Sequence, residues 1–271
     1  MRTRPGVEPY TTRTPRVVAA RRLQRRRERT ATGRFLVEGP QAVREAAGSV
    51  VELFVTGDAA DRYPEIVAAA DAAGARISPV TDDALAALAE TVQPQGLVAV
   101  CTAIDVPLDE ALRRRPTLVA VLADIRDPGN AGTVLRTADA AGAAAVVFAG
   151  EAVDPYNGKA VRASAGSLFH VDVVRTGDPR RAVDDLRSAG LTVYAADAHG
   201  AVDLDHVALD RPTAWLFGSE AHGLPGVLAE AADARVRVPI HGRAESLNLA
   251  AAAAVCLYAS ASGQRYPGGS R

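Results

Sequence analysis

The sequence has 271 residues, of which 48% are hydrophobic and 23% are charged, and its formal net charge is −1. This composition is typical of a folded globular protein. The sequence contains no run of roughly 20 apolar residues, the length that a membrane-spanning helix needs, and its basic start lacks the apolar region of a secretory signal. These features argue against membrane and secreted proteins, and we expect a cytoplasmic one.

Cysteine and histidine usage argues against a metal protein. Cys101 and Cys256 each lie in an apolar run, so we expect two buried thiols in a reducing compartment, with a disulfide between them as the alternative. The five histidines show no metal-ligand spacing, and no Cys-x-x-Cys occurs. We therefore expect no metal site.

The small net charge conceals an asymmetry along the chain. Residues 1–34 contain eleven arginines and two glutamates, a net charge of +9, which leaves −10 for the remainder. Such a basic arm typically contacts a polyanion, although it can also be a solvated tail. Residues 1–15 are rich in proline and should be largely unstructured, whereas 16–29 can form a basic helix. We take 1–30 as a basic, partly disordered extension.

Residues 31–104 alternate between short apolar strands and amphipathic helices. This alternation predicts a small α/β domain. Gly74 is placed to end a helix, and Thr81 to begin one. The expected strands cover 35–37, 51–56, 75–80 and 96–103, and the expected helices cover 41–47, 64–73 and 82–90.

A charged linker with prolines, 105–116, precedes a second domain over 117–271. Buried-strand runs alternate there with helices, which predicts a mostly parallel α/β sheet whose ligands bind beyond the carboxyl ends of the strands. The expected strands are 117–123, 145–148, 171–174, 192–196, 213–217 and 235–238, and the expected helices are 131–141, 180–189, 227–232 and 246–260, with a polar loop leading to 159–165.

Several familiar motifs are absent from this domain. There is no G-x-G-x-x-G for a dinucleotide and no G-x-S-x-G for a hydrolase nucleophile. Gly218 and Gly223 have the glycine spacing of a phosphate-binding loop, but 224–225 is Leu-Pro where Lys-Ser/Thr would be needed. We therefore discard nucleoside triphosphate hydrolysis.

The first of three distinctive segments is 127–136, Asp-Pro-Gly-Asn-Ala-Gly-Thr-Val-Leu-Arg. A turn after a buried strand begins a helix here. Asn130 can cap that helix and orient a polar ligand, and Arg136 can grip a phosphate with two hydrogen bonds. Alone, the segment is equally a capped helix with a surface arginine.

The second segment is 215–225, where an apolar strand opens into a loop bracketed by Gly218 and Gly223. Glycines allow the backbone to approach a ligand closely, and Glu220 can bind a ligand amine or a catalytic arginine. The simpler interpretation is a surface turn.

The third segment is 236–250, in which Ser246 and Asn248 lie at the start of a very apolar helix. Ser246 can be a simple N-cap. Asn248 needs hydrogen-bond partners at the head of a buried helix.

Taken together, the three segments resemble the SPOUT class of RNA methyltransferases, and within it the SpoU/TrmH-type RNA ribose 2′-O-methyltransferases. Residues 130–136 match the family's N-x-G-x-x-x-R pattern, and 217–223 match its F-G-x-E-x-x-G. Residues 238–248 match I-P-(M/I)…S-L-N, with Val238 in place of the usual isoleucine. The three matches occur in the family order.

The resemblance extends over most of the chain. Residues 34–40 and 94–100 look like the ends of the family's small N-terminal substrate-binding domain, and 161–166 looks like its (V/L)-R-x-S-x-G segment. The implied fold is α/β, a C-terminal trefoil-knotted parallel-sheet SPOUT domain preceded by a small α/β RNA-binding domain resembling ribosomal proteins. The implied cofactor is S-adenosyl-L-methionine. The implied assembly is a homodimer in which the partner's first-motif arginine completes the site.

The resemblance also implies roles for individual residues. Those expected to serve catalysis are Arg136, Asn130, Glu220, Ser246 and Asn248. Those expected to line the cofactor pocket are Phe217, Gly218, Val238, Ile240 and Leu247. In the family the arginine is assigned to activating the ribose hydroxyl. Because arginine stays protonated in proteins, we expect it mainly to clamp the substrate phosphate and stabilise the forming alkoxide.

The substrate is the least determined feature. The small domain favours 23S ribosomal RNA over transfer RNA, and the Asn130–Arg136 pair with the Ser-Leu-Asn triplet favours a ribose over a base. Four alternatives stay open: a tRNA ribose methyltransferase, a base-methylating SPOUT enzyme, a non-catalytic RNA-binding assembly factor and a small-molecule transferase. The target nucleotide, and whether its methylation confers antibiotic resistance, stay open as well.

Overall fold

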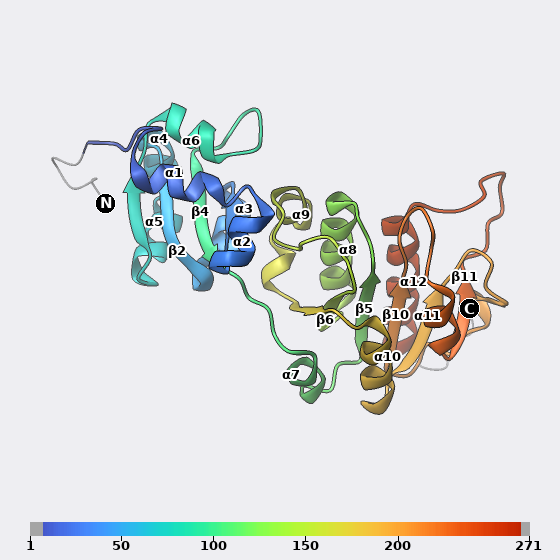
Figure 1. Cartoon of the computed structure of the whole chain (residues 1–271). Coiled ribbons are helices and arrows are strands. Elements are labelled where there is room, and N and C mark those ends of the chain that lie inside the picture. Colours follow the sequence, from blue (N-terminus) through green and yellow to red (C-terminus); the bar gives the residue numbers. More distant parts are fainter. Residues whose placement is uncertain (1–7, 267–271) are drawn as a thin grey trace. The chain divides into compact units, whose positions relative to one another are not determined.

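The computed structural model describes residues 8–266, and the chain divides into two compact units (Figure 1). The first unit contains the chain up to Ile104 together with the segment Tyr156–Phe169. The second contains Asp105–Pro155 and the chain from His170 onward. The segment Tyr156–Phe169, which we expected within the second domain, therefore packs with the first unit.

The first unit is built on a four-stranded sheet with the strand order β1-β4-β2-β3. β1 (Arg34–Glu38) and β2 (Val50–Val55) pair antiparallel with β4 (Leu97–Thr102), and β3 (Arg76–Pro79) runs parallel to β2. Five of the six residues of β4 are buried. This central position explains why its sequence is an apolar run without alternation.

Short helices surround this sheet. Thr56 and Thr81 begin two of them, because each side chain accepts a hydrogen bond from the backbone N–H three residues on. The expected cap at Thr81 is confirmed. The helices of this unit are α1 (Pro15–Arg22), α2 (Arg26–Thr32), α3 (Pro40–Glu45), α4 (Gly57–Arg62), α5 (Pro64–Ala72), α6 (Asp82–Leu88) and α9 (Gly158–Ser164), with short 3₁₀ helices η1 (Ala47–Ser49) and η2 (Ser167–Phe169).

The N-terminal segment differs from the expectation of one basic helix over 16–29. The structure has two helices, α1 and α2, with a turn between them. Val17, Ala20 and Leu23 are buried in a hydrophobic core cluster of the first unit. Their spacing of three residues places them on one helix face, so this part of the chain is folded into the unit and is not an extension. Residues 1–7 lie outside the described part of the chain.

The second unit contains a seven-stranded sheet in which every neighbouring pair is parallel. Its strand order is β7-β6-β5-β10-β8-β11-β9. The two-residue strand β9 was not expected, because it is too short to show an alternating pattern. The strands are β5 (Leu118–Ala123), β6 (Ala145–Ala149), β7 (Asp172–Thr176), β8 (Thr192–Ala196), β9 (Val202–Asp203), β10 (Thr213–Phe217) and β11 (Ala234–Arg237).

Helices connect these strands, and α12 packs against α8 and β10. The last helix begins three residues later than the sequence suggested. Among residues 8–266, no helix is both long and apolar enough to cross a bilayer. The helices are α7 (Leu108–Arg113), α8 (Pro128–Ala141), α10 (Pro179–Ser188), α11 (Gly226–Ala231) and α12 (Leu249–Arg265), with the 3₁₀ helix η3 (Leu204–His206).

Both cysteines are buried and free, which confirms the expectation of small buried side chains. Burial raises the pKa of the Cys101 thiol and that of the Cys256 thiol to about 12 in each case. Neither thiol forms a reactive thiolate at neutral pH.

A buried hydrogen bond fixes α12 on the central strand. Trp215 donates from Nε1 to Oγ of Ser260 at 2.8 Å, and both residues are fully buried. Ser260→Ala leaves the indole N–H without an acceptor, so we expect the free energy of unfolding to fall by about 1–3 kcal/mol. Urea unfolding followed by the fluorescence of this single tryptophan measures the change. The control is Ser262→Ala at an exposed position of the same helix, and equal stability losses in both variants would contradict the assignment.

Candidate active site

The three distinctive segments of the sequence meet where the central strands of the second unit end. β5 and β10 are parallel neighbours, so their carboxyl ends lie at the same edge of the sheet (Figure 1). The loop after β5 leads into α8, and the loop after β10 leads into α11. β10 is inserted between β5 and β8, which both precede it in sequence. In open parallel sheets, ligands bind at the carboxyl edge where the strand order reverses.

Asp127, and not Asn130, caps α8. The Asp127 carboxylate accepts hydrogen bonds from the backbone N–H groups of Gly129 and Asn130, the latter at 3.1 Å. Pro128 follows at the first helical position, where its missing N–H costs nothing. The run Asp-Pro-Gly-Asn contains this capping signal, so our assignment of the cap to Asn130 was wrong. Since the cap is supplied by Asp127, the Asn130 amide is available for other partners.

Three side chains from the three distinctive segments form one hydrogen-bond chain. Asn248 donates from Nδ2 to Oδ1 of Asn130 at 3.3 Å, and Asn130 donates from Nδ2 to Oε1 of Glu220 at 2.9 Å. Glu220 also accepts from the backbone N–H groups of Arg126 and Asp127, each at 3.3 Å. Asn248 is in addition the N-cap of α12. The chain of hydrogen bonds therefore connects the starts of α8 and α12 with the loop after β10.

These hydrogen bonds control the charge of Glu220. Partial burial acts to raise the pKa of its carboxyl. The hydrogen bonds from the Asn130 amide and from backbone N–H groups act in the opposite direction, and together they hold the pKa of Glu220 below the ordinary value of a glutamate, 4.5. Hydrogen bonds to the charged form stabilise that form. Glu220 is therefore a carboxylate at neutral pH, acting as an acceptor.

A pH dependence follows from this lowered pKa. The ionised form of Glu220 stabilises the folded protein fully above pH 4.5, and this contribution is lost as the pH falls through the lower folded-state pKa. We expect Glu220→Gln to reduce the urea midpoint of unfolding at pH 7, and the difference from wild type to shrink as the pH falls through the lowered folded-state pKa of Glu220. Glu230→Gln, on an exposed side chain of α11, is the control and should show no such trend. A difference that does not depend on pH would contradict the ionised acceptor.

The loop after β10 is a tight ring made possible by Gly218. The backbone N–H of Ser219 donates to the carbonyl of Gly223 at 3.0 Å, and the reverse bond is 2.9 Å. An added Cβ at Gly218 would lie 2.2 Å from the carbonyl carbon of Gly223 and 2.3 Å from the nitrogen of Leu224. Phe217, which precedes the ring, is 2% exposed and belongs to the core. The ring therefore presents backbone groups, and Phe217 contributes packing.

Arg136 is not part of this hydrogen-bond chain. It lies six residues after Asn130 in α8, which turns the helix by about 600° and so directs Arg136 about 120° away from Asn130. Its side chain is exposed and makes no hydrogen bond or ion pair within residues 8–266. Its guanidinium is therefore available to a ligand or to a second chain.

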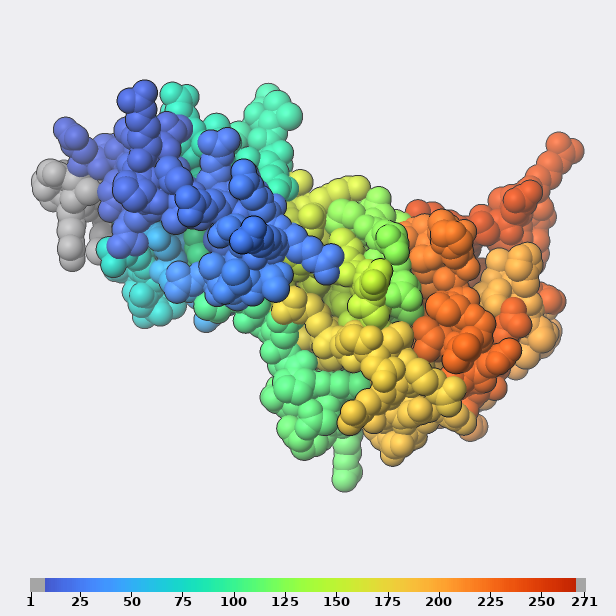
Figure 2. All heavy atoms as spheres, viewed as in Figure 1, coloured from blue at the N-terminus to red at the C-terminus, as the bar shows by residue number. Residues whose placement is uncertain are grey.

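The remaining predicted residues lie between β11 and α12, in a segment that projects from the surface of the second unit (Figure 2). Val238 is half-buried, whereas Ile240 and Leu247 are 37% and 39% exposed. Ser246 is exposed, and within the described chain its hydroxyl has no hydrogen-bond partner. The structure therefore brings Asn130, Glu220 and Asn248 together but leaves Ser246 outside their hydrogen bonds.

The donor and acceptor set suits an organic ligand better than a metal ion. Ile240 and Leu247 are apolar side chains without full protein packing, which suits an aromatic base or an aliphatic chain. The backbone ring beginning at Gly218 offers polar groups at the same end of the sheet. Within residues 8–266, no group of three or more His, Cys, Asp or Glu residues is arranged to hold a metal ion.

Comparison with known proteins identifies the family of this chain. A model of the SpoU rRNA Methylase family matches residues 117–258, and one of the MRM3-like substrate binding domain matches residues 14–99. The 23S rRNA (guanosine(2553)-2′-O)-methyltransferase RlmP of Bacillus subtilis is 36% identical, over 88% of this chain and 92% of that protein. The 23S rRNA (guanosine-2′-O-)-methyltransferase RlmB of Bordetella pertussis is 33% identical, over 80% of this chain and 91% of that protein.

Solved structures show the same fold with cofactor bound. The AdoMet-bound rRNA methyltransferase from Sinorhizobium meliloti has a TM-score of 0.83 at 31% identity and covers 93% of this chain and 97% of its own. The SpoU methyltransferase AviRb from Streptomyces viridochromogenes, in complex with AdoMet, has a TM-score of 0.81 at 30% identity, covering 93% and 99%. The fold and the site define a SPOUT-class RNA methyltransferase. Within that class, the chain belongs to the SpoU rRNA methylase family, and the resemblance stated from the three motifs is confirmed.

Proposed function

We propose that this protein transfers a methyl group from S-adenosyl-L-methionine to the 2′-hydroxyl of a ribose in RNA, with 23S ribosomal RNA as the substrate. The hydrogen-bond chain from Asn248 through Asn130 to Glu220 carries this proposal, because it unites the three family motifs at the carboxyl edge of the sheet. The names of the relatives from B. subtilis and B. pertussis support the substrate. A ribosomal RNA substrate would place the protein in the cytoplasm.

The ring after β10 and the segment before α12 are the proposed cofactor site. Bound S-adenosyl-L-methionine supplies an electrophilic methyl group on a positively charged sulfur. The backbone around Gly218 and Val238 would hold its polar edges, and Ile240 and Leu247 would cover its apolar parts. Such cover would account for the exposure of these two apolar side chains. The proposed trefoil knot would surround this site, which agrees with the insertion of β10 between two earlier strands.

Arg136 is the proposed catalytic group. A ribose hydroxyl is a poor nucleophile until its proton is removed. Arginine remains protonated. We therefore assign two roles to Arg136: its guanidinium forms bidentate hydrogen bonds with the substrate phosphate, and its charge stabilises the forming alkoxide. The proton then passes to the phosphate. Asn130, Glu220, Ser246 and Asn248 would orient the ribose and the guanidinium.

The direction of Arg136 supports a homodimer. Because the side chain points away from the Asn130–Glu220 pair of its own chain, it can complete the site of a partner. The exposed face of α12 carries Val255 and Tyr258, 41% and 49% exposed, as an apolar surface for a partner chain. A twofold symmetric dimer would then contain two shared sites.

Mixed dimers test this sharing. The variants Arg136→Lys and Asn130→Ala are co-expressed, each with a different affinity tag. A mixed dimer then contains one intact site only if the arginine acts across the interface. We expect each variant alone to be inactive and the randomly mixed pool to recover about a quarter of wild-type methyl transfer. A mixed pool as inactive as the separate variants would contradict a shared site, as would a monomer in sedimentation analysis.

The first unit offers a basic surface for RNA. Figure 2 shows the N-terminal helices, in dark blue, with side chains at its surface. Seven exposed arginines of this region have no ion pair within residues 8–266, and such unpaired charges suit phosphates. They are Arg13, Arg21, Arg22, Arg25, Arg26, Arg27 and Arg34.

Methyl transfer from labelled S-adenosyl-L-methionine tests the proposed function. The acceptors are unmodified 23S ribosomal RNA and bulk transfer RNA, followed by nucleoside analysis. We expect a 2′-O-methyl nucleoside in 23S ribosomal RNA. The same product in transfer RNA alone would reassign the substrate, and a methylated base would reassign the reaction. Absence of both transfer and cofactor binding would overturn the proposal in favour of a non-catalytic RNA-binding protein.

A further inference from the structure

The segment Tyr156–Phe169 follows β6 and precedes β7 of the second unit, yet it packs with the first unit. Its two end residues, Tyr156 and Phe169, both pack on Phe35 of β1. The centroid of the Phe35 ring lies 4.5 Å from the ring centroid of Tyr156 and 6.2 Å from that of Phe169. The Tyr156 hydroxyl accepts a hydrogen bond from the backbone N–H of Ile104 at 2.9 Å. The segment is thus part of the core of the substrate-binding unit.

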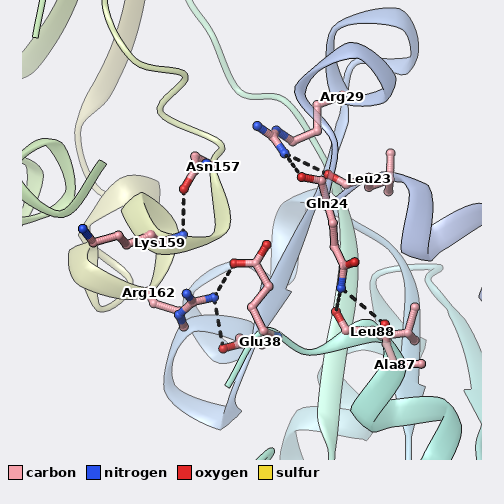
Figure 3. Close-up of polar contacts among 10 residues, drawn as sticks. Leu23, Gln24, Arg29, Glu38, Ala87, Leu88, Asn157, Lys159 and Arg162 are labelled. Carbon is pink, nitrogen blue, oxygen red and sulfur yellow. Dashed lines mark hydrogen bonds and ion pairs between the residues drawn. The ribbon is translucent and has the colours of Figure 1, made fainter. Parts of the chain in front are cut away.

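Arg162 on α9 makes the central polar contact of this packing. It lies 2.8 Å from a carboxylate oxygen of Glu90 and 3.4 Å from Oε1 of Glu38, and Figure 3 shows it directed toward Glu38. The Glu38 side chain is only 13% exposed, and its Oε1 is buried without any hydrogen-bond partner in the described residues. Arg162 is therefore the compensating charge for that oxygen. Breaking such a pair on one side leaves a buried charge uncompensated.

The chain just before this segment contacts the active-site loop of the second unit. The backbone N–H of Glu151 donates to Asp124 at 2.7 Å, and that of Val153 donates to the carbonyl of Ile125 at 2.8 Å. Gly150 has a φ of +72°, and an added Cβ there would meet the Asp124 carboxylate at 2.3 Å. The same loop continues to Arg126 and Asp127, whose N–H groups hold Glu220.

The chain just after the segment contacts the active-site helix. His170 Nδ1 lies 2.8 Å from a carboxylate oxygen of Asp139 on α8. Both ends of the segment are therefore attached to elements that carry the proposed site, while its middle is held by Glu38 and Glu90 of the substrate-binding unit.

We propose that residues 150–170 couple the substrate-binding unit to the hydrogen bonds around Glu220, with Arg162 as the positioning residue. The inference rests on the proposed function, since the coupled event is methyl transfer to RNA. Positioning matters because a shift of about 1 Å in reacting groups can cost about 100-fold in rate. Arg162 does not touch the reacting atoms. It holds the middle of the segment on the first unit, while Glu151 and Val153, just before the segment, hydrogen-bond with the loop from Asp124 to Asp127.

The test compares Arg162→Met, Arg162→Lys and the control Arg44→Met. Arg44 forms a 3.0 Å ion pair with Glu65 on the same unit, but both side chains are about half exposed. We expect Arg162→Met to lower kcat by about 2- to 30-fold, with KM for RNA and Kd for S-adenosyl-L-methionine within about twofold of wild type. Arg162→Lys should recover part of the loss, because it keeps the charge. Arg44→Met should match wild type.

Amide hydrogen exchange supplies a readout that does not depend on activity. In Arg162→Met, exchange at Asp124–Asp127 should be faster than in wild type and in Arg44→Met. Wild-type kcat in Arg162→Met, or exchange at that loop unchanged from wild type, would overturn the coupling. If wild type itself transfers no methyl group, the proposed function fails, and the exchange measurement still decides whether Arg162 supports the loop.

Discussion

Replacing Arg136 by lysine should lower methyl transfer to RNA by about 100- to 1,000-fold while leaving S-adenosyl-L-methionine binding unchanged. Lysine keeps the positive charge but lacks the planar pair of donors that grips a phosphate on two oxygens. The expected magnitude is that of removing one donor aimed at a developing oxyanion. Stability should be unaffected, because Arg136 is exposed and makes no ion pair within residues 8–266.

Single-turnover transfer to 23S ribosomal RNA and calorimetric cofactor titration measure the two quantities. The control is Arg115→Lys, at another exposed arginine of the second unit. Near-normal methyl transfer by Arg136→Lys would contradict bidentate binding of the phosphate and would show that the positive charge alone is sufficient. Loss of cofactor binding would place Arg136 in the cofactor site instead.

Replacing Gly218 by alanine should weaken S-adenosyl-L-methionine binding by about 10- to 100-fold. The new methyl group would overlap backbone atoms of Gly223 and Leu224 at 2.2–2.3 Å, and backbone cannot rotate aside as a side chain can. Overpacking of this kind costs about 1–3 kcal/mol. We expect the backbone ring to open in order to relieve the overlap, and to lose the shape that binds the cofactor. Each 1.4 kcal/mol of lost binding free energy is a tenfold loss of affinity.

Gly226→Ala is the matched control. Gly226 begins α11 in the same connection, and an added Cβ there meets no atom within 4 Å. Its cofactor affinity should equal that of wild type in calorimetric titration. Wild-type affinity in Gly218→Ala would show that the ring is not part of the cofactor site.

Local patterns identified most elements of the fold. Apolar runs located β5, β6 and β10, because strands covered on both faces need no alternation. Two errors have local causes. The cap of α8 was assigned to Asn130 although Asp127 stands directly before proline, and the start of α12 was placed at Ser246 although Asn248 supplies the capping oxygen.

The family can be recognised without any knowledge of contacts, because three spaced motifs in fixed order identify it. The motifs also predict Asn130, Glu220 and Asn248 as functional residues, and these roles stay predictions. The hydrogen bonds that link these three residues became visible only in the folded chain, since the bonded residues are 90 and 118 positions apart in sequence. The tertiary structure also decided that α9 packs with the first unit, through Phe35 and through the need of the buried Glu38 carboxylate for a positive charge. Periodicity records which face of an element is buried, but not which distant element buries it.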